Sequence, residues 1–169
     1  REVRLAGEKL VPVCYTIEQH ALDLGLSEEQ AKELEMHARK HVEEGHASLV
    51  FPDVVPFLSR LEGKKSVMTF GPRDHQTHRV QASGLLPPIS DIHIATLEDS
   101  KAAQLARMID TSMPITFIDD DADQLALVHE QGLPIKLIRM RRPGQRKSVD
   151  EHGLDNVAWR VIQSFDELQ

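Results

Sequence analysis

Residues 115–123 read ITFIDDDAD, and this stretch decides the fold. Four residues that favour β-strands run directly into a group of aspartates, and Pro114 stands just before them. A short apolar run of this kind is typical of a buried strand in a parallel sheet. The acidic group would then follow the carboxyl end of the strand, where open α/β sheets build their binding sites.

The acidic group contains Asp119, Asp120, Asp121 and Asp123, which are four carboxylates within five positions. Carboxylates crowded in this way repel one another unless a cation holds them, and hard oxygen ligands suit Mg²⁺. The alternative is that the aspartates cap the next helix and favour the positive end of its dipole. Capping would account for one aspartate, whereas four in five positions favour a magnesium site.

Composition limits the class of protein. A chain of 169 residues with 40% hydrophobic and 28% charged residues fits one soluble globular domain, with or without a small subdomain. The formal charge of −7 argues against a general nucleic-acid binder. Cys14 is the single cysteine, so no internal disulfide can form, and we expect a reducing cytoplasmic environment. No apolar run is long enough to span a membrane, and we find no signal peptide.

The first part of the sequence predicts helices. Capping-box spacing starts one helix at Thr16, which Gly25 would end, and a second at Ser27, which Gly45 would end. A third helix is expected over residues 53–62. Residues 1–12 show no clear periodicity.

After Gly63 the pattern changes to strands that alternate with helices. Such alternation is typical of right-handed βαβ crossovers and a parallel sheet. The expected strands cover residues 66–70, 91–95, 115–118, 135–140 and 159–162, with helices over 74–83, from about 100, and over 121–131, and a final helical turn capped by Ser164.

Two further polar residues stand at the end of a strand and the start of a helix. Thr69 ends its strand just before Gly71, and a hydroxyl beside the N–H groups of a glycine turn can hold a phosphate oxygen. Threonine is also a common strand residue. Lys101 opens a helix, where a cation is poorly placed. Neutralising a phosphate and nearby carboxylates would explain that position, and a solvated surface lysine is the alternative.

In this order and spacing, these residues resemble the haloacid dehalogenase-like (HAD) hydrolase superfamily over about residues 50–165. Residues 67–71, VMTFG, are similar to its second motif, Lys101 to its third, and residues 115–123 to its fourth. The resemblance implies an α/β fold, with a Rossmann-like parallel sheet flanked by helices. It also implies an amino-terminal segment and small helical cap in residues 1–49 and an α/β core in residues 50–169.

The resemblance implies a Mg²⁺-dependent phosphatase that acts on a small phosphate ester. The metal would be held or oriented by Asp119 and Asp120. The phosphoryl group would be bound by Thr69 and Gly71, and Lys101 would neutralise its charge. Asp123 is expected to fix the loop rather than to bind metal.

The sequence departs from the superfamily at its first motif, an apolar strand that ends in Asp-x-Asp and provides the attacking carboxylate. No stretch of this chain supplies the motif in its place, and the order of the motifs puts it before Arg1. The sequence therefore looks truncated at its amino terminus, and we expect residues 1–169 alone to be inactive. The missing strand would lie between those that carry Thr69 and Asp119. Residues 10–14 are the nearest substitute, but Pro12 argues against a central strand.

A second hypothesis is a non-catalytic HAD-fold protein that binds a partner or regulates it. Its binding surface would be the cap or a basic loop formed by Arg139, Arg141, Arg142, Arg146 and Lys147. The same loop could steer an anionic substrate, contact nucleic acid, or be a solvated loop without a role. An Asp-x-Asp strand upstream would favour the enzyme over the binding protein.

Other candidate residues carry weaker signals. His37 and His41 stand one helical turn apart with Glu33 on the same face, a possible metal stripe or simply a solvated helix face. His75 and His78 follow the Thr69 turn and could border the site. Cys14 as a nucleophile has no accompanying His or Asn motif.

Overall fold

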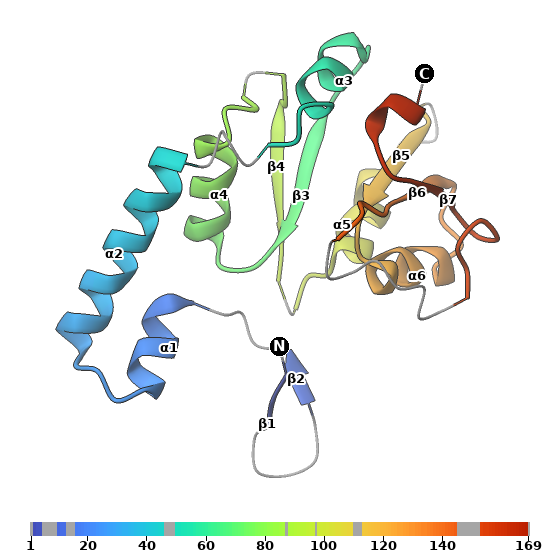
Figure 1. The fold of residues 1–169 in the computed structure, drawn as a ribbon. Coiled ribbons are helices and arrows are strands. Elements are labelled where there is room, and N and C mark those ends of the chain that lie inside the picture. The colour runs from blue at the N-terminus through green and yellow to red at the C-terminus, as the bar shows by residue number, and fades with distance from the viewer. Residues whose placement is uncertain are drawn as a thin grey trace. The chain divides into compact units, whose positions relative to one another are not determined.

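The computed structural model describes residues 2–4, 10–12, 16–45, 50–86, 88–96, 98–109, 113–144 and 153–168. They form two compact units, one made of Arg1–Phe51 with Gly63–Leu97 and the other of Pro52–Glu62 with Glu98–Gln169 (Figure 1). The predicted boundary between cap and core, at residues 49 and 50, stays a prediction.

In the first unit, helices α1 (Ile17–Asp23) and α2 (Glu28–Gly45) form a hairpin. The predicted capping residues start both helices. The Gln19 N–H donates to Thr16 Oγ1 at 3.1 Å, and Ser27 and Gln30 exchange two hydrogen bonds of 3.0 and 3.3 Å. These caps satisfy N–H groups that have no partner inside a helix, so the sequence signal and the observed helix starts agree.

Two short strands precede this hairpin, β1 (Glu2–Arg4) and β2 (Leu10–Pro12). They pair with each other in antiparallel fashion, where the sequence shows no periodicity. Pro12 therefore lies outside the parallel ladders, in keeping with its poor fit to a central strand.

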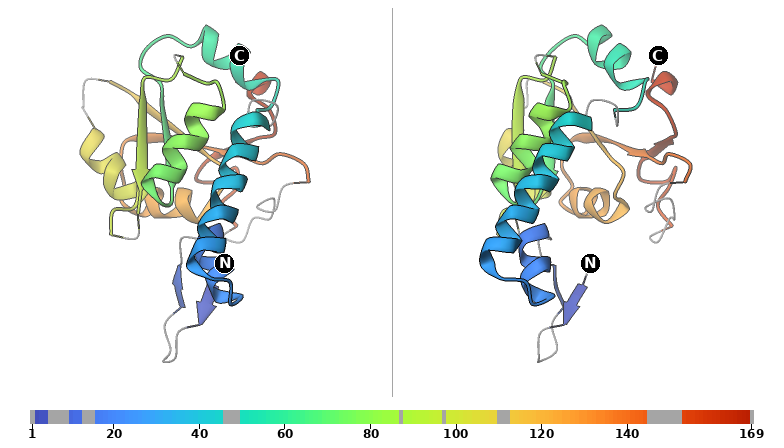
Figure 2. Two further views of the ribbon diagram at one scale, coloured as in Figure 1. Left: turned by 90° about the vertical axis from the view of Figure 1, so that its left-hand side faces the viewer. Right: turned by 60° about the vertical axis from the view of Figure 1, so that its left-hand side comes forward.

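The same unit contains a parallel ladder of β3 (Ser66–Phe70) and β4 (Asp91–Ala95), whose bounds match the predicted strands residue for residue. Helix α4 (Arg73–Ala82) connects them and packs on both β4 and α2. Figure 2 shows α4 and α2 side by side. The β3–α4–β4 path is the βαβ unit that the alternating pattern predicts.

The second unit holds a parallel sheet in the order β5–β6–β7, with strands Ile115–Asp119, Ile135–Met140 and Arg160–Ile162. Helix α6 (Ala122–Glu130) packs on β5 and β6 and contacts α5 (Lys101–Met108) (Figure 1). The unit buries Leu125, Val128, Ile138 and Ile162 almost completely, and these side chains belong to its apolar core.

Helix α3 (Val54–Arg60) joins the carboxyl-terminal segment in this unit through a 3-10 helix, η2 (Phe165–Glu167). The rings of Phe57 and Phe165 stack with centroids 4.4 Å apart. Ser164 caps η2 with a complete capping box, as predicted. Segments about 110 positions apart in the sequence are thus held together.

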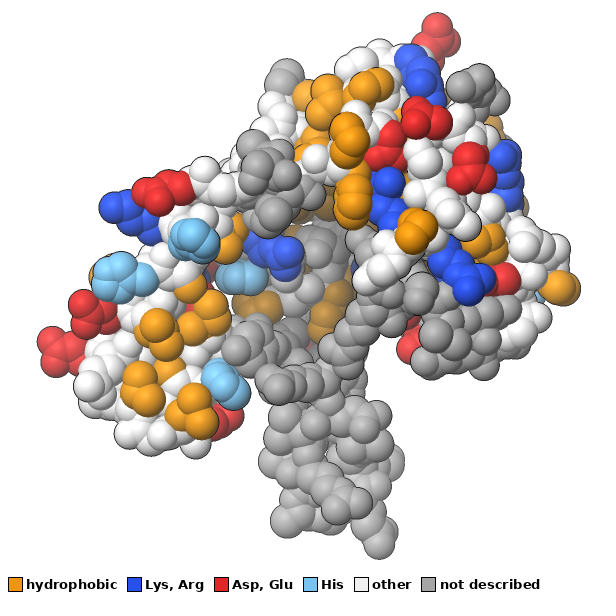
Figure 3. Space-filling model, in the orientation of Figure 1, with side chains coloured by type: hydrophobic (Ala, Val, Ile, Leu, Met, Phe, Trp, Pro, Cys, Tyr) orange, Lys and Arg blue, Asp and Glu red, His pale blue; other side chains and the backbone are white. Residues whose placement is uncertain are grey.

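The α/β fold class with parallel strands is confirmed. Among the described strands, the parallel ones form two ladders, β3–β4 and β5–β6–β7, rather than one continuous sheet. None of the helices in the described part of the chain is long and apolar enough to cross a membrane. The α1–α2 hairpin leaves Leu24, Leu34 and Met36 exposed, and apolar side chains lie beside histidines in that part of Figure 3.

Candidate functional site

The candidate site in the second unit is built around Asp119, the last residue of β5. Asp119 is only 8% exposed, and both of its carboxylate oxygens accept hydrogen bonds. Oδ2 accepts from Lys101 Nζ at 2.5 Å, and Oδ1 accepts from the N–H of Asp121 at 2.9 Å. The strand end therefore carries a buried carboxylate with a fixed orientation.

Lys101 is the first residue of α5, and its helix is capped by Ser100, whose hydroxyl accepts from Ala103 N–H at 3.2 Å. The Lys101 side chain is 10% exposed and forms the ion pair with Asp119. The alternative of a solvated surface lysine is wrong. Burying an ammonium group is costly unless it is paired, so Asp119 is the physical reason why a cation stands at this helix start.

The other aspartates differ in whether helix capping or a magnesium site explains them. Asp121 is the N-cap of α6, and its side chain accepts from Asp123 N–H at 3.2 Å, so the capping explanation holds for Asp121. Asp123 lies exposed in the first turn of that helix. Asp120 is exposed at the turn between β5 and α6. It therefore places a solvent-exposed carboxylate next in sequence to the buried Asp119.

This donor set fits Mg²⁺ only in part. Across the described residues, no group of three or more His, Cys, Asp or Glu side chains is arranged to hold a metal ion. Mg²⁺ usually keeps several waters and takes one or two carboxylates together with substrate phosphates. Asp119 and Asp120 match that limited protein contribution, so magnesium binding stays a prediction.

Thr69 and Gly71 belong to the first unit, where Thr69 is the penultimate residue of β3 and Gly71 lies in the turn between β3 and α4. The Thr69 hydroxyl donates to Gln76 Oε1 at 2.9 Å, and the Gly71 N–H donates to the carbonyl of Ala95 at 3.2 Å. The glycine amide is therefore used to extend the ladder. The first hydrogen bond of helix α4 runs from Gln76 N–H to Pro72 O. The N–H groups of residues 73–75 precede it and have no acceptor one turn earlier within the helix. Such groups favour an anion.

The histidines fall into two groups. His37, His41 and Glu33 are exposed on α2, which supports the solvated helix face over the metal stripe. His78 lies on α4, and its Nε2 is 2.8 Å from a carboxylate oxygen of Glu43 on α2. This contact ties the helical hairpin to the β3–α4–β4 segment.

His75 lies on the same helix, and its environment favours the neutral ring. Burial lowers its pKa, and the nearby positive charge of Arg79 lowers it further. The carboxylate of Glu35 opposes this shift, while Arg39 and His78 add to it.

In the described part of the predicted basic loop, the three arginines lie close to buried aspartates. Arg139 lies within β6, where it is 1% exposed and donates to both carboxylate oxygens of Asp155 at 2.8 and 2.9 Å. Trp159 Nε1 donates to the same carboxylate at 2.8 Å. Arg141 is more exposed, 3.4 Å from Asp155. For Arg139, both the solvated-loop and the steering interpretations are wrong, because its charge is neutralised inside the unit.

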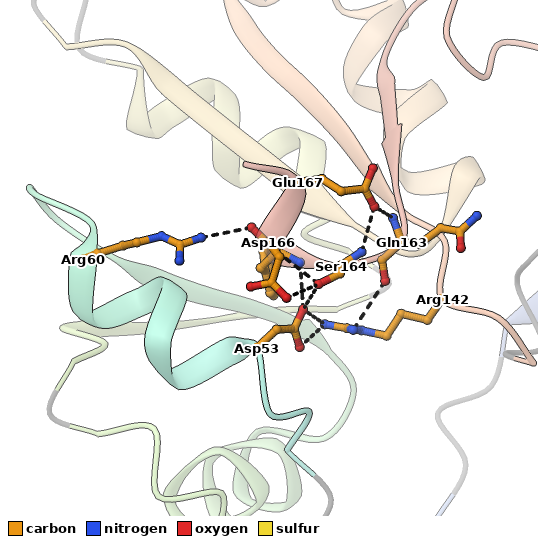
Figure 4. Close-up of polar contacts among 8 residues, drawn as sticks. Asp53, Arg60, Arg142, Gln163, Ser164, Asp166 and Glu167 are labelled. Atoms are coloured by element: carbon orange, nitrogen blue, oxygen red, sulfur yellow. Dashed lines mark hydrogen bonds and ion pairs between the residues drawn. The ribbon is translucent and has the colours of Figure 1, made fainter. Parts of the chain in front are cut away.

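Arg142 has a similar structural role (Figure 4). Its Nη2 lies 2.8 Å from both oxygens of Asp53, and Oδ2 also accepts from Ser164 Oγ and the Phe165 N–H. The cluster joins the start of α3 to the segment before η2. Arg146, Lys147 and Cys14 lie outside the described residues.

The sequence reasoning missed two kinds of residue. Asp53 and Asp155 are buried counter-ions of arginines 89 and 16 positions away, and such partners leave no local pattern. Gln76 is different, because it stands seven positions after Thr69 in the first turn of α4. A polar side chain near the start of that helix is a signal that could have been used.

Comparisons with known proteins support the fold. No protein-family model and no curated protein matches the chain. The crystal structure of the HAD-hydrolase YfnB from Bacillus subtilis, bound to magnesium, aligns with 89% of this chain and 75% of its own, with a TM-score of 0.52 and 18% identity. The chain thus has a HAD-like α/β fold, which confirms the fold that the sequence motifs predicted.

Proposed function

We propose that this chain carries the phosphoryl-binding and metal-binding residues of a Mg²⁺-dependent HAD-like phosphohydrolase that acts on a small phosphate ester. The observation that carries the proposal is the buried Lys101–Asp119 pair at the end of β5. It supports the expected third and fourth motifs, because Lys101 and Asp119 come from separate elements of a HAD-like fold. The magnesium-bound state of YfnB supports the choice of metal.

Each residue has a distinct role in the proposal. Asp119 and Asp120 would hold Mg²⁺, which when bound supplies positive charge to the phosphoryl oxygens. Lys101 neutralises charge on the transferring group while it keeps Asp119 oriented. Thr69 contributes its hydroxyl, and the N–H groups that open α4 point their dipole at an anion.

Attack on phosphorus also needs an oxygen nucleophile. The superfamily places it on a strand ahead of the Thr69 strand, and the printed sequence has no Asp-x-Asp there. We therefore assign no nucleophile among these residues. Binding of phosphate and Mg²⁺, rather than turnover, is the property that the 169 residues must have.

Calorimetric titration of the chain with inorganic phosphate in the presence of Mg²⁺ tests the proposal. Wild-type protein should bind phosphate, and chelation of the metal should weaken that binding. Lys101→Met should abolish most of it. Lys136→Met is the matched control. Lys136 is exposed on β6, so this substitution removes the same charge at a position away from the Lys101–Asp119 pair. Equal affinity in both lysine variants, or no binding by the wild type, would contradict the proposal.

The same titration separates the second hypothesis, a non-catalytic protein that binds a partner. Such a protein would have no requirement for phosphate or Mg²⁺. Its proposed surface loses support at Arg139 and Arg142, which are engaged within their own unit.

The single Cys14 fits a reducing compartment, and we propose that the protein is located in the cytoplasm.

A further inference from the structure

The side chain of Gln76 reaches across the turn after β3 to Thr69, near the end of that strand. It rises from the first turn of α4, and its Oε1 accepts the Thr69 hydroxyl hydrogen at 2.9 Å. On its other side, its Nε2 lies 2.7 Å from the position that a Cβ on Gly71 would take. One amide therefore bonds to Thr69 and fills the space that a side chain at residue 71 would need.

The direction of this hydrogen bond matters for phosphate binding. A hydroxyl has one hydrogen to donate and two lone pairs that accept, whereas a glutamine amide offers an acceptor on one side and donors on the other. In the observed arrangement, the hydrogen of Thr69 is used by Gln76. Phosphate oxygens accept hydrogen bonds, so Thr69 cannot serve a phosphate until this hydrogen is released.

We propose that Gln76 is a positioning residue, whose amide turns over when phosphate binds and so directs the Thr69 hydroxyl to the phosphoryl oxygen. In the bound state, Nε2 would donate to Thr69 Oγ1, and the hydroxyl hydrogen would pass to the phosphate. The two bonds would then polarise each other in the same direction. The inference rests on the proposed function, because it needs an anion at the Thr69 turn.

Gly71 makes room for this movement. Its φ of +137° lies in a region that side chains rarely adopt, and a Cβ there would meet the Gln76 amide. Glycine thus leaves the amide free to turn. The glycine in the turn and the glutamine on the helix are thus both consistent with rotation of the Gln76 amide.

Gln76 could instead simply tie α4 to β3, a structural role in which phosphate has no part. Two variants separate these roles. Gln76→Met removes the amide and keeps an unbranched chain, and Thr69→Val removes the hydroxyl and keeps the side-chain shape. If Gln76 acts through Thr69, its substitution should matter only where the hydroxyl is present.

Phosphate affinity is measured by calorimetry with Mg²⁺ for the wild type, both single variants and the double variant. Gln76→Met should weaken binding about tenfold, the order expected for one hydrogen bond to a charged group. The double variant should bind no more weakly than Thr69→Val alone. The matched control is Gln81→Met, since Gln81 is exposed on the same helix.

A second measurement on the wild type avoids any dependence on variant stability. The side-chain amide resonances of Gln76, identified by their loss in Gln76→Met, should shift in ¹H–¹⁵N spectra when inorganic phosphate is added. Unshifted resonances, wild-type affinity in Gln76→Met, or additive losses in the double variant would each overturn the inference and leave the proposed function standing. No phosphate binding by the wild type would overturn both.

Discussion

Two buried ion pairs in the second unit look alike and differ in use. Lys101 and Asp119 meet at the end of β5, while Arg142 and Asp53 join α3 to the segment before η2. Their side chains are similarly enclosed, 10% and 5% exposed in the first pair and 11% and 7% in the second. Burial of opposite charges therefore does not by itself distinguish a functional site from a structural one.

The difference lies in how far each carboxylate is satisfied. Asp53 receives the planar guanidinium of Arg142, the hydroxyl of Ser164 and the N–H of Phe165. Asp119 receives one point-charge ammonium and one backbone N–H, beside the exposed Asp120. A guanidinium holds a carboxylate with a fixed fork, whereas an ammonium can share its donors with another anion. The Lys101–Asp119 pair is therefore suited to exchange hydrogen-bond partners with a bound anion, whereas the Arg142–Asp53 pair is suited to a fixed structural role.

Substitution of the first cation should have the largest effect. Lys101→Met leaves Asp119 charged and buried with one donor fewer, which should cost about 3–5 kcal/mol of unfolding free energy. It should also lower phosphate affinity at least about 100-fold in the presence of Mg²⁺, since a charge-neutralising donor is lost. Chemical denaturation and calorimetry measure the two effects. Loss of stability with unchanged phosphate binding would make this pair as structural as the other.

Arg142→Met should separate the pairs. Asp53 keeps Ser164 and Phe165 as donors, so we expect a loss of about 3 kcal/mol of unfolding free energy, with phosphate affinity unchanged. Arg141→Met is the matched control. That side chain is 43% exposed and 3.4 Å from its partner, so its loss should be within about 0.5 kcal/mol. A fall in phosphate affinity in Arg142→Met would place this cluster in the site after all.

The elements were predictable because their signals are local. Capping at Thr16, Ser27 and Ser164 and the apolar run before Asp119 each act within a few residues, and the structure shows the expected helix and strand there. The β1–β2 hairpin was not predicted, because three-residue strands give no usable periodicity.

The site was predictable only where position and charge conflict. Lys101 was found because a cation at the positive end of a helix needs a cause, and Asp119 is that cause. Arg139 and Arg142 were wrongly assigned to a free basic loop. Their counter-ions lie far along the chain, and a run of basic residues in the sequence resembles a solvated loop. Distant pairing of this kind needs the folded structure.

Acid should weaken the Asp53 cluster in a defined pH range. Burial alone would raise the pKa of Asp53, but hydrogen bonds from Arg142, Phe165 and Ser164 and the charge of Arg142 together lower it. A lowered pKa in the folded state gives stability that is complete above the unfolded pKa, about 3.9, and is lost as pH falls through the folded value. The advantage of the wild type over Asp53→Asn should thus be constant above about pH 5 and shrink below about pH 4. Denaturation at each pH measures it, and an advantage that persists unchanged at low pH would show that the carboxylate is not the source.

Mg²⁺ should give the smallest effect, and it acts on the Asp119 side of the comparison alone. At ten times its dissociation constant, the ion would add about 1.4 kcal/mol, which corresponds to about 3–5 °C in melting temperature for a chain of this length. Asp120→Asn should remove this increment without disturbing the Lys101–Asp119 pair, because Asp120 is exposed. Asp123→Asn is the matched control, since that carboxylate lies exposed in the first turn of α6 and should leave the increment intact. Each variant is compared with itself without Mg²⁺, so that changes in intrinsic stability cancel. An equal increment in wild type and Asp120→Asn would remove Asp120 from the metal site, and the exposed aspartates would then serve the start of α6 alone.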